Sequence, residues 1–200
     1  MKRSGRITAA QKANLQDLDL YRPKIKNLEN KHIVLDIGFG NGEYTAAYAN
    51  AFKEKHLIAT EVYLSGIGSL IGFINKHKIL NISIFDEDVR LLMDQMPEGF
   101  LDSVNILFPD PWQKAKHHKR RLLGKDFLFQ LHPLLKPNAK IFVRTDWEDY
   151  ARQIDELAEG MSSHYILKKI QKIEFEFKTR FHLRAIKKGR HISSFLFTKL

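Results

Sequence analysis

Residues 33–43 read Ile-Val-Leu-Asp-Ile-Gly-Phe-Gly-Asn-Gly-Glu, an apolar run that leads into a glycine-rich turn. The apolar run predicts a buried strand, and the glycines allow a tight turn and close approach of the backbone to a ligand. Tyr44, Ala47, Tyr48 and Ala51 follow at helical spacing. The stretch therefore predicts a strand, a turn and a helix, which is the first unit of an α/β sheet.

The same alternation continues along the chain. Further strands are predicted at Leu57–Glu61, Ile82–Phe85, Val104–Phe108 and Ala139–Thr145, with helical stripes at Ile67–Ile74, Val89–Met96, Phe127–Leu135 and Trp147–Met161. Residues 173–177 and 192–197 alternate apolar with polar side chains, which predicts an antiparallel pair. The fold class is α/β: a doubly wound, Rossmann-like sheet, mostly parallel with antiparallel C-terminal strands. Ligands of such sheets bind outside the carboxyl ends of the strands.

Composition favours a polyanionic partner. The 200 residues carry a formal net charge of +10 and 44% hydrophobic residues, as expected of a globular basic protein. Without cysteine the chain has no disulfides or thiolate metal sites, and no metal is predicted. No apolar run reaches the roughly 18 residues of a membrane span. The basic, polar start, with Lys2, Arg3, Arg6 and Lys12, is not a secretory signal, so we expect a cytoplasmic protein. We expect residues 1–30 to form a basic, flexible arm with a short helix, and residues 31–200 a single domain.

Acidic side chains end the first three predicted strands. The turn has the spacing Gly38-x-Gly40-x-Gly42, and Glu43 stands where a dinucleotide-binding pattern has its third glycine. A carboxylate there would repel a pyrophosphate, so a cationic adenosyl ligand fits better. Asp36 can accept from an ammonium group, and Glu61 can accept from two ribose hydroxyls. These residues favour S-adenosylmethionine as cofactor.

The acids at 86–88 have two interpretations. One of them can accept from an adenine amine, or they can form a solvated helix start, where carboxylates are stabilised by the helix dipole. We expect one ligand contact among the three.

The fourth strand ends in Phe108-Pro109-Asp110-Pro111-Trp112-Gln113-Lys114, and a basic run follows at 116–121. The two prolines end the strand and hold Asp110 in a turn. A carboxylate at a strand end beside a cationic patch indicates chemistry on a nucleic acid; the alternative is a solvated turn.

Together these motifs resemble one family, the bacterial tRNA (guanine-N7-)-methyltransferases. The motifs that carry the resemblance are Gly38–Gly42, Glu61–Tyr63, Phe108–Trp112, His117–Arg121, Thr145–Trp147 and Thr179–Phe181. The resemblance extends from about Gly5 to the C-terminus. It implies a class I, S-adenosylmethionine-dependent methyltransferase that modifies N7 of a guanine in the tRNA variable loop, usually at position 46.

The resemblance also implies roles for individual residues. The cofactor would contact Asp36, Gly38, Gly40, Glu61, Glu87, Asp88 and Asp110. Asp110 would be the acid of the catalytic site. The substrate would contact Lys114, Asp146, Thr179, Arg180, Phe181 and His182.

Three positions depart from the family pattern. Asp36 stands where the family commonly has glutamate, and Glu87-Asp88 replaces the usual Asp-Ala, which leaves open which acid contacts adenine. The Thr-Arg-Phe block usually ends in glutamate, and here His182 follows it.

Guanine N7 already carries a lone pair, so its methylation requires no general base. We expect Asp110 to position the base and stabilise the developing positive charge. Asp146 is either a second contact to the guanine edge or the N-cap of the helix that follows it. Trp112 and Trp147 can stack on bases, although the place of Trp147 on an apolar stripe favours core packing.

The cations form two clusters, residues 114–121 and a C-terminal group at Arg180, Arg184, Lys187, Lys188 and Arg190, which we expect to contact phosphates. Other interpretations are a non-catalytic RNA-binding domain, an NAD-dependent oxidoreductase, and a methyltransferase for exocyclic amines. The sequence does not decide between a monomer and a homodimer.

Overall fold

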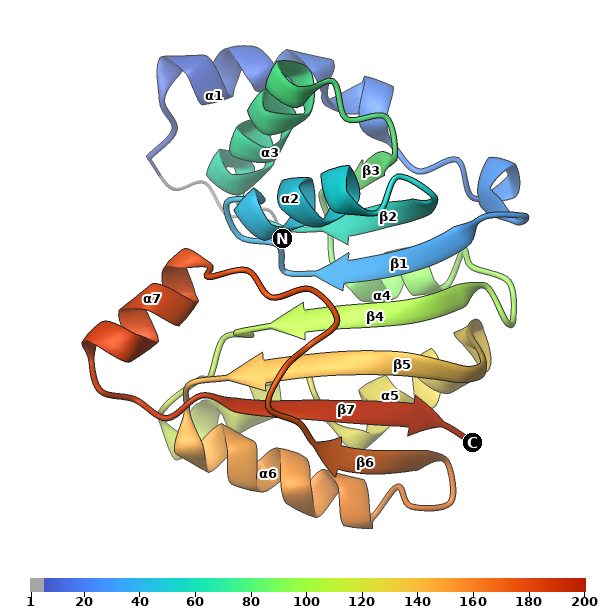
Figure 1. Ribbon diagram of the computed structural model, residues 1–200, viewed down its shortest axis with the longest axis vertical. Helices are drawn as coiled ribbons and strands as arrows, with labels where there is room; N and C mark the ends of the chain where they lie inside the picture. The colour runs from blue at the N-terminus through green and yellow to red at the C-terminus, as the bar shows by residue number, and fades with distance from the viewer. Residues whose placement is uncertain (1–5) are drawn as a thin grey trace.

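The computed structural model describes residues 6–200; Lys2, Arg3 and Gly5, used above, lie outside them. Its centre is a seven-stranded sheet in the order β3-β2-β1-β4-β5-β7-β6 (Figure 1). The strands are β1 His32–Ile37, β2 Lys55–Thr60, β3 Ile82–Phe85, β4 Leu101–Leu107, β5 Leu135–Thr145, β6 Tyr165–Lys169 and β7 Ser193–Lys199. The first five are parallel, and β7 runs antiparallel to both β5 and β6. The predicted fold class is confirmed.

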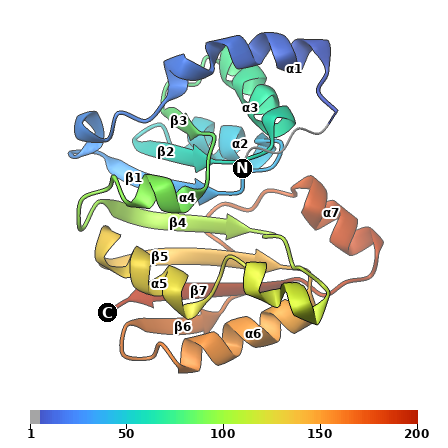
Figure 2. The ribbon, with the colours of Figure 1, turned by 180° about the vertical axis from the view of Figure 1, so that it is seen from behind.

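Helices cover both faces of the sheet. The helices are α1 Ala9–Asn14, α2 Glu43–Ala51, α3 Leu64–His77, α4 Val89–Met93, α5 Lys125–Leu131, α6 Glu148–Glu159 and α7 Arg180–Lys187, and those that pack on the sheet are α2 to α6. One apolar core lies between the sheet and α4, α5 and α6, and the other lies between the sheet and α2 and α3. Figure 2 shows α4 and α5 in front of the sheet, on the face opposite α2. Because both faces are covered, strands β1, β2 and β3 are almost wholly buried.

The strand order reverses at β1, which pairs with both β2 and β4. The carboxyl ends of β1, β2, β4 and β5 point to the side of the molecule where α7 lies (Figure 1). This point is the place where open α/β sheets bind their ligands.

The predicted strand at 173–177 is wrong, because the partner of β7 is β6, Tyr165–Lys169. Residues 170–178, here called the strap, instead cross the sheet face that carries α2. Phe175 and Phe177 pack against the aromatic side chains of α2, and Glu174 and Glu176 form ion pairs. The alternation of the sequence is real, but it reflects these contacts and not a strand ladder.

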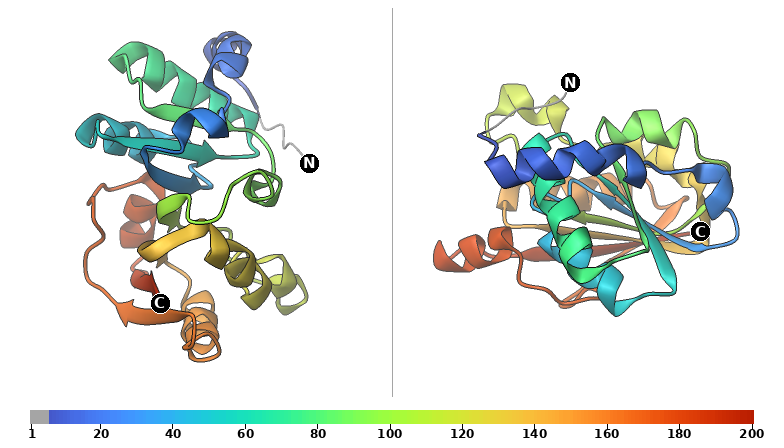
Figure 3. Two further views of the ribbon diagram at one scale, coloured as in Figure 1. Left: turned by 90° about the vertical axis from the view of Figure 1, so that its right-hand side faces the viewer. Right: turned by 90° about the horizontal axis from the view of Figure 1, so that it is seen from above.

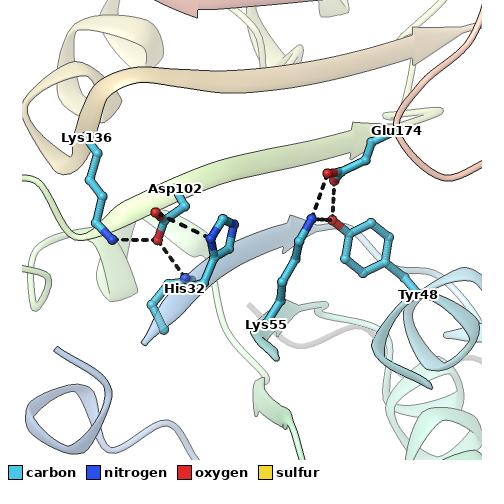
Figure 4. Close-up of polar contacts among 7 residues, drawn as sticks. His32, Tyr48, Lys55, Asp102, Lys136 and Glu174 are labelled. Carbon is cyan, nitrogen blue, oxygen red and sulfur yellow. Dashed lines mark hydrogen bonds and ion pairs between the residues drawn. The ribbon is translucent and has the colours of Figure 1, made fainter. Parts of the chain in front are cut away.

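Two ion-pair groups hold the starts of strands, at the end of the sheet away from α7 (Figure 4). Lys55, at the start of β2, donates to Glu174 of the strap at 2.7 Å and to the Tyr48 hydroxyl at 3.1 Å. Asp102 accepts from Lys136 at 2.7 Å and from the backbone N–H of Ile33 at 2.8 Å. The first group anchors the strap that leads to α7.

The basic N-terminal segment contains the expected short helix, α1, and it packs against α3. Gln11 donates to the Ser69 hydroxyl at 2.9 Å, and Asn14 donates to the Gly68 carbonyl at 2.9 Å. A Cβ at Gly68 would lie 2.6 Å from the Gln11 carbonyl oxygen, so this close packing requires glycine. Figure 3 shows α1 lying across α3.

The observed element boundaries differ from the predicted ones where an apolar run continues from one element into the next. The Phe127–Leu135 stripe divides between α5, which ends at Leu131, and β5, which begins at Leu135. Within residues 6–200, none of the helices combines the length and the apolar character needed to cross a bilayer.

Candidate active site

The glycine-rich turn joins β1 to α2 at the reversal of strand order. Gly38, Gly40 and Gly42 all have positive φ, at 72°, 61° and 77°, a backbone conformation that residues with a Cβ rarely adopt. The Gly38 N–H donates to the carbonyl of Thr60 on β2 at 2.8 Å. An ideal Cβ at Gly38 would meet no atom within 4 Å, so a ligand has room to approach this backbone.

Asp36 ends β1 beneath this turn and is 2% exposed. Its carboxyl accepts a hydrogen bond from the Thr45 hydroxyl of α2 at 2.6 Å. Burial raises the pKa of Asp36 to about 7; the Thr45 bond opposes the shift and the charge of Glu61 adds to it. A buried carboxyl in this state is stabilised as an anion when a cation binds beside it.

Glu61 follows β2 and is 8% exposed. One carboxylate oxygen accepts from the Gly40 N–H at 2.9 Å, and the other accepts from the backbone N–H groups of Val62 and Tyr63 at 2.7 and 3.2 Å. Burial raises the pKa of Glu61, against the effect of these bonds. A carboxylate has about four acceptor positions, so one remains for a ligand hydroxyl.

The three acids after β3 differ in their surroundings. Asp86 is fully buried and accepts from Arg22 of the N-terminal segment at 2.8 Å. Asp88 caps α4, accepting from the Arg90 N–H at 3.0 Å, as expected of a helix start. Glu87 is exposed beside Asp88. Glu87 and Asp88 line a pocket at this end of the sheet.

Two adjoining pockets lie over the carboxyl ends of the strands. The first, of about 380 Å³, is lined by Asp36, the glycine turn and the N-terminal residues of α7. The second, of about 310 Å³, is lined by Glu61, Glu87, Asp88 and Asp110. Gly38, Gly40 and Phe181 line both, so the two pockets meet above the glycine turn. Every residue predicted to contact the cofactor lines at least one of them.

The loop after β4 holds Asp110 at the rim of the second pocket. Phe108 and Trp112, on either side of the Pro-Asp-Pro turn, have φ of +55° and +45°. Bulky residues in the left-handed region cost about 1–3 kcal/mol each, and such strain is concentrated at functional sites. Asp110 itself is exposed to solvent.

Helix α7 begins beside the glycine turn. Thr179 caps it by accepting from the His182 N–H at 3.1 Å, and Arg180 donates to Glu43 of α2 at 2.9 Å. The Phe181 ring lies over Gly40 and stacks on Phe108 at a centroid distance of 6.4 Å. Thr179, Arg180 and Phe181 line the first pocket, opposite the glycine turn and Asp36; their predicted contact with the substrate stays a prediction.

The remaining predicted substrate residues line neither pocket. Lys114 is exposed on the loop that follows Asp110. His182 is half-buried, and burial lowers its pKa, with the charge of Arg144 as a further cause.

Asp146, the last of this group, is held at 2.7 Å by Arg190, which also lies over the Trp147 ring at 5.2 Å. Asp146 is not the N-cap of α6: Trp147 has that position, and its N–H donates to the Thr145 hydroxyl at 3.2 Å. Trp147 packs against the core, as the apolar stripe predicted.

The two predicted cationic clusters are not uniformly available to a ligand. Arg121 is buried, and Arg180 and Arg190 are paired with carboxylates. Arg180 is exposed although it is paired, and the other exposed members are Lys114, Lys116, Lys119, Arg120, Arg184, Lys187 and Lys188. The expectation of phosphate contacts therefore does not extend to Arg121.

Sequence reasoning missed several residues that shape the site. A Cβ at Gly66 of α3 would lie 2.0 Å from the Gly40 carbonyl oxygen, so Gly66 allows the helix to touch the glycine turn. A glycine within a helical stripe was the available signal. Neither Thr45, which binds Asp36, nor Arg22, which binds Asp86, carried any signal in the sequence.

The site as a whole combines buried acids, an open glycine turn and exposed cations along one edge. The Asp36 carboxyl fits a ligand ammonium, the free position of Glu61 fits a ribose hydroxyl, and the open backbone at Gly38 permits close contact. These features fit S-adenosylmethionine. Because Glu61, Glu87 and Asp88 line the second pocket, this ligand would extend across both pockets, with Asp110 and Phe181 beside it.

Comparison with known proteins agrees with this geometry. Residues 30–195 match a family model described as "Putative methyltransferase". A tRNA (guanine-N(7)-)-methyltransferase of Nitrosomonas europaea is 41% identical over 169 residues, which cover 83% of this chain and 75% of the relative. The tRNA (guanine-N(7)-)-methyltransferase of Nitrosospira multiformis is 39% identical, over 82% of this chain and 73% of the relative.

Solved structures show the same fold at low identity. An rRNA methylase from Streptococcus thermophilus superposes with a TM-score of 0.60 at 13% identity, covering 98% of this chain and 99% of that one. A tRNA (m1A58) methyltransferase from Aquifex aeolicus superposes with a TM-score of 0.55 at 15% identity, covering 100% of this chain and 72% of that one. With its glycine turn, its strand-end acids and the Pro-Asp-Pro-Trp loop at one edge of this sheet, the chain belongs to the tRNA (guanine-N(7)-)-methyltransferase family.

Proposed function

We propose that this protein transfers a methyl group from S-adenosylmethionine to N7 of a guanine in tRNA, at position 46 of the variable loop. The observation that carries the proposal is the meeting of two pockets above the glycine turn, with the buried acid Asp36 in one and Asp110 at the rim of the other. The family membership of the chain gives the reaction its class and its substrate.

The cofactor is assigned to the residues that line these pockets. Asp36 would accept from the ammonium group, Gly38 and Gly40 would lie against the ligand with their backbone, and Glu61 would accept from a ribose hydroxyl. Glu87 and Asp88 are the acids beside the adenine; because Asp88 already caps α4, Glu87 is the better acceptor. S-adenosylmethionine supplies the methyl group from a cationic sulfonium, which becomes a thioether.

Asp110 is assigned to the guanine. The bond to N7 forms from the lone pair of that nitrogen, so no proton is removed first and the positive charge passes to the purine ring. The Asp110 carboxylate can accept from the guanine N1–H and amino groups and stabilise this charge; preorganised charge of this kind contributes about 3 kcal/mol to lowering a barrier.

The surrounding residues are assigned to the RNA. Phe181 offers an aromatic face at the junction of the pockets, and Thr179, Arg180 and His182 lie with it at the start of α7. Lys114 and the exposed cations near it would contact phosphates. Asp146 and Arg190 form a pair next to Trp147, so Asp146 reaches a base once Arg190 moves to a phosphate.

Residues 31–200 would form the methyltransferase domain and residues 1–30 a basic arm, in which Gln11 and Asn14 contact α3 and Arg22 contacts Asp86. A cytoplasmic location follows from the proposed tRNA substrate.

The test incubates the protein with methyl-labelled S-adenosylmethionine and unmodified tRNA, and then treats the RNA with borohydride and aniline. We expect label in the tRNA and cleavage at guanine 46. Label without cleavage at an N7-methylguanine would disprove the assigned atom. Binding of S-adenosylhomocysteine without any transfer would favour a non-catalytic RNA-binding protein.

A further inference from the structure

Arg121 ends the basic run after Asp110, yet its side chain is only 1% exposed. The neighbouring Lys119 and Arg120 are exposed. A side chain enclosed to this degree does not reach a phosphate on an RNA surface. Arg121 therefore has a different role from the cations beside it.

The Arg121 guanidinium makes three hydrogen bonds. Its Nε donates to the Pro111 carbonyl at 2.8 Å, one terminal nitrogen donates to Gln153 at 2.7 Å, and the other donates to Asp149 at 2.5 Å. The group also lies 4.8 Å from the centre of the Tyr150 ring. The planar fork of arginine suits this set of acceptors, and a lysine ammonium does not.

The same stretch is joined to α6 at a second point. The Leu123 N–H donates to the Tyr150 hydroxyl at 3.0 Å, and Gln153 donates to the Leu123 carbonyl at 3.1 Å. Asp149, Tyr150 and Gln153 lie on one face of α6, which begins directly after the Asp146-Trp147 turn. Arg121 thus links the loop after β4 to the helix that follows β5.

The loop that Arg121 holds is strained. Pro111 is the neighbour of Asp110 in the chain, and the turn has left-handed backbone at both Phe108 and Trp112. Such a conformation persists only where surrounding contacts offset its cost. The buried bond from Arg121 to the Pro111 carbonyl is one of those contacts.

We propose that Arg121 is a positioning residue that clamps the Asp110 loop onto α6 and so sets the place of the Asp110 carboxylate over the second pocket. The effect on catalysis rests on the proposed function. Arg121 does not contact the substrate; it acts through the Pro111 carbonyl. A displacement of about 1 Å at a reacting group costs about a hundredfold in rate, so a loosened loop is expected to lower turnover more than binding.

The kinetic test compares Arg121→Met and Arg121→Lys with Lys119→Met, which removes an exposed cation of the same run. We expect both Arg121 variants to lower kcat, by about a hundredfold for Met, with little change in the KM for tRNA. Lys119→Met should raise that KM and leave kcat near the wild-type value. Rescue of Arg121 by lysine, or a rise in KM alone, would identify a phosphate contact and overturn the proposal.

A second measurement does not depend on methyl transfer. The chain has two tryptophans: Trp112 lies on the loop that Arg121 holds, and Trp147 is the N-cap of α6. In a Trp147→Phe background, we expect Arg121→Met to increase acrylamide quenching of Trp112, while the affinity for S-adenosylhomocysteine by calorimetry is kept. Unchanged quenching would overturn the proposal, whereas absence of methyl transfer by the wild type would count against the proposed function alone.

If Arg121→Met does not fold, the link is tested from α6. Gln153→Met removes one acceptor of the guanidinium, Asp149→Asn removes the negative charge of another, and both leave Arg121 in place. Each is expected to lower kcat several-fold at near-constant KM for tRNA and to increase Trp112 quenching. Wild-type values of both kcat and quenching in the two variants would overturn the proposal.

Discussion

The pockets lie over the carboxyl ends of the strands, here called the ligand edge. Its two halves, at β1 and β2 and at β4 and β5, differ in the sign and the burial of their charged side chains. At the ends of β1 and β2, Asp36 and Glu61 are buried and bound by a hydroxyl and by backbone N–H groups. On the side of β4 and β5, Arg121 and Arg190 are bound by Asp149 and Asp146, among lysines that remain exposed. The first half is an enclosed acidic pocket for a small cationic ligand, and the second is an open cationic surface for a large anion.

The difference has a physical cause. A buried carboxyl is stabilised when a compact cation enters its pocket, because the pair is then shielded from water. A polyanion presents many phosphates over a wide surface, so exposed cations bind it best and release its counterions. The arginines already paired with carboxylates keep the loops in place between these two surfaces. The net charge of the chain therefore overstates the number of cations available to RNA.

The strongest test of the comparison is Asp110→Ala, because Asp110 stands where the two halves meet. We expect methyl transfer to fall by about a hundredfold or more, since a preorganised charge at the reacting base is lost. The affinity for S-adenosylhomocysteine should stay near wild type, because the buried acids of the first half are unchanged. The measurements are a methyl-transfer assay and calorimetry. Near-normal turnover would show that the second half needs no acid.

The next test concerns the burial of Asp36. Its pKa is about 7 in the folded protein, above the ordinary value of 3.8, so the native state binds a proton that the unfolded chain releases between these pH values. The stabilisation from this proton is complete below about pH 3.8 and is lost as the pH rises through 7.

We therefore expect the free energy of unfolding of the wild type, relative to Asp36→Asn, to fall by about 4 kcal/mol from pH 4 to above pH 7. Urea unfolding of both proteins across this range measures the difference. If the free energies of unfolding of the two proteins changed in parallel with pH, Asp36 would be solvated. The first half would then not differ from the second in the burial of this acid.

Gly66→Ala probes how tightly the first half is built. The added methyl would lie 2.0 Å from the Gly40 carbonyl oxygen, so the glycine turn or α3 must move. Overpacking of this kind costs about 1–3 kcal/mol in stability, and we expect a loss of about tenfold in affinity for S-adenosylhomocysteine.

Gly124→Ala is the matched control, because a Cβ there meets no atom within 4 Å and Gly124 lies outside both pockets. It should leave the affinity unchanged. Equal effects of the two substitutions would mean that helix α3 does not constrain the turn.

The sequence predicted the enclosed half better than the open half. The strand-end acids were found because parallel strands bring their carboxyl ends to one edge, and apolar runs marked those strands. The burial of Arg121 was not predictable from a run of cations, since it depends on α6, whose contacts lie about 30 residues further on. A strand was predicted at residues 173–177 of the strap because the alternation is the same whether polar side chains face water or form ion pairs.

The smallest expected effect concerns single cations of the open half. Each phosphate contact releases counterions, so removing one should reduce the slope of log affinity against log salt by about 1. Lys119→Ala and Lys187→Ala should each do so for tRNA, since both side chains are exposed on the ligand edge or on α7. Lys53→Ala is the control, because Lys53 is also exposed but precedes β2, at the end of the sheet opposite the pockets. Filter binding at several salt concentrations measures the slopes. If Lys53→Ala lowered the slope as much as the other two, the affinity for tRNA would depend on net charge alone. The cations of the open half would then not form the tRNA-binding surface.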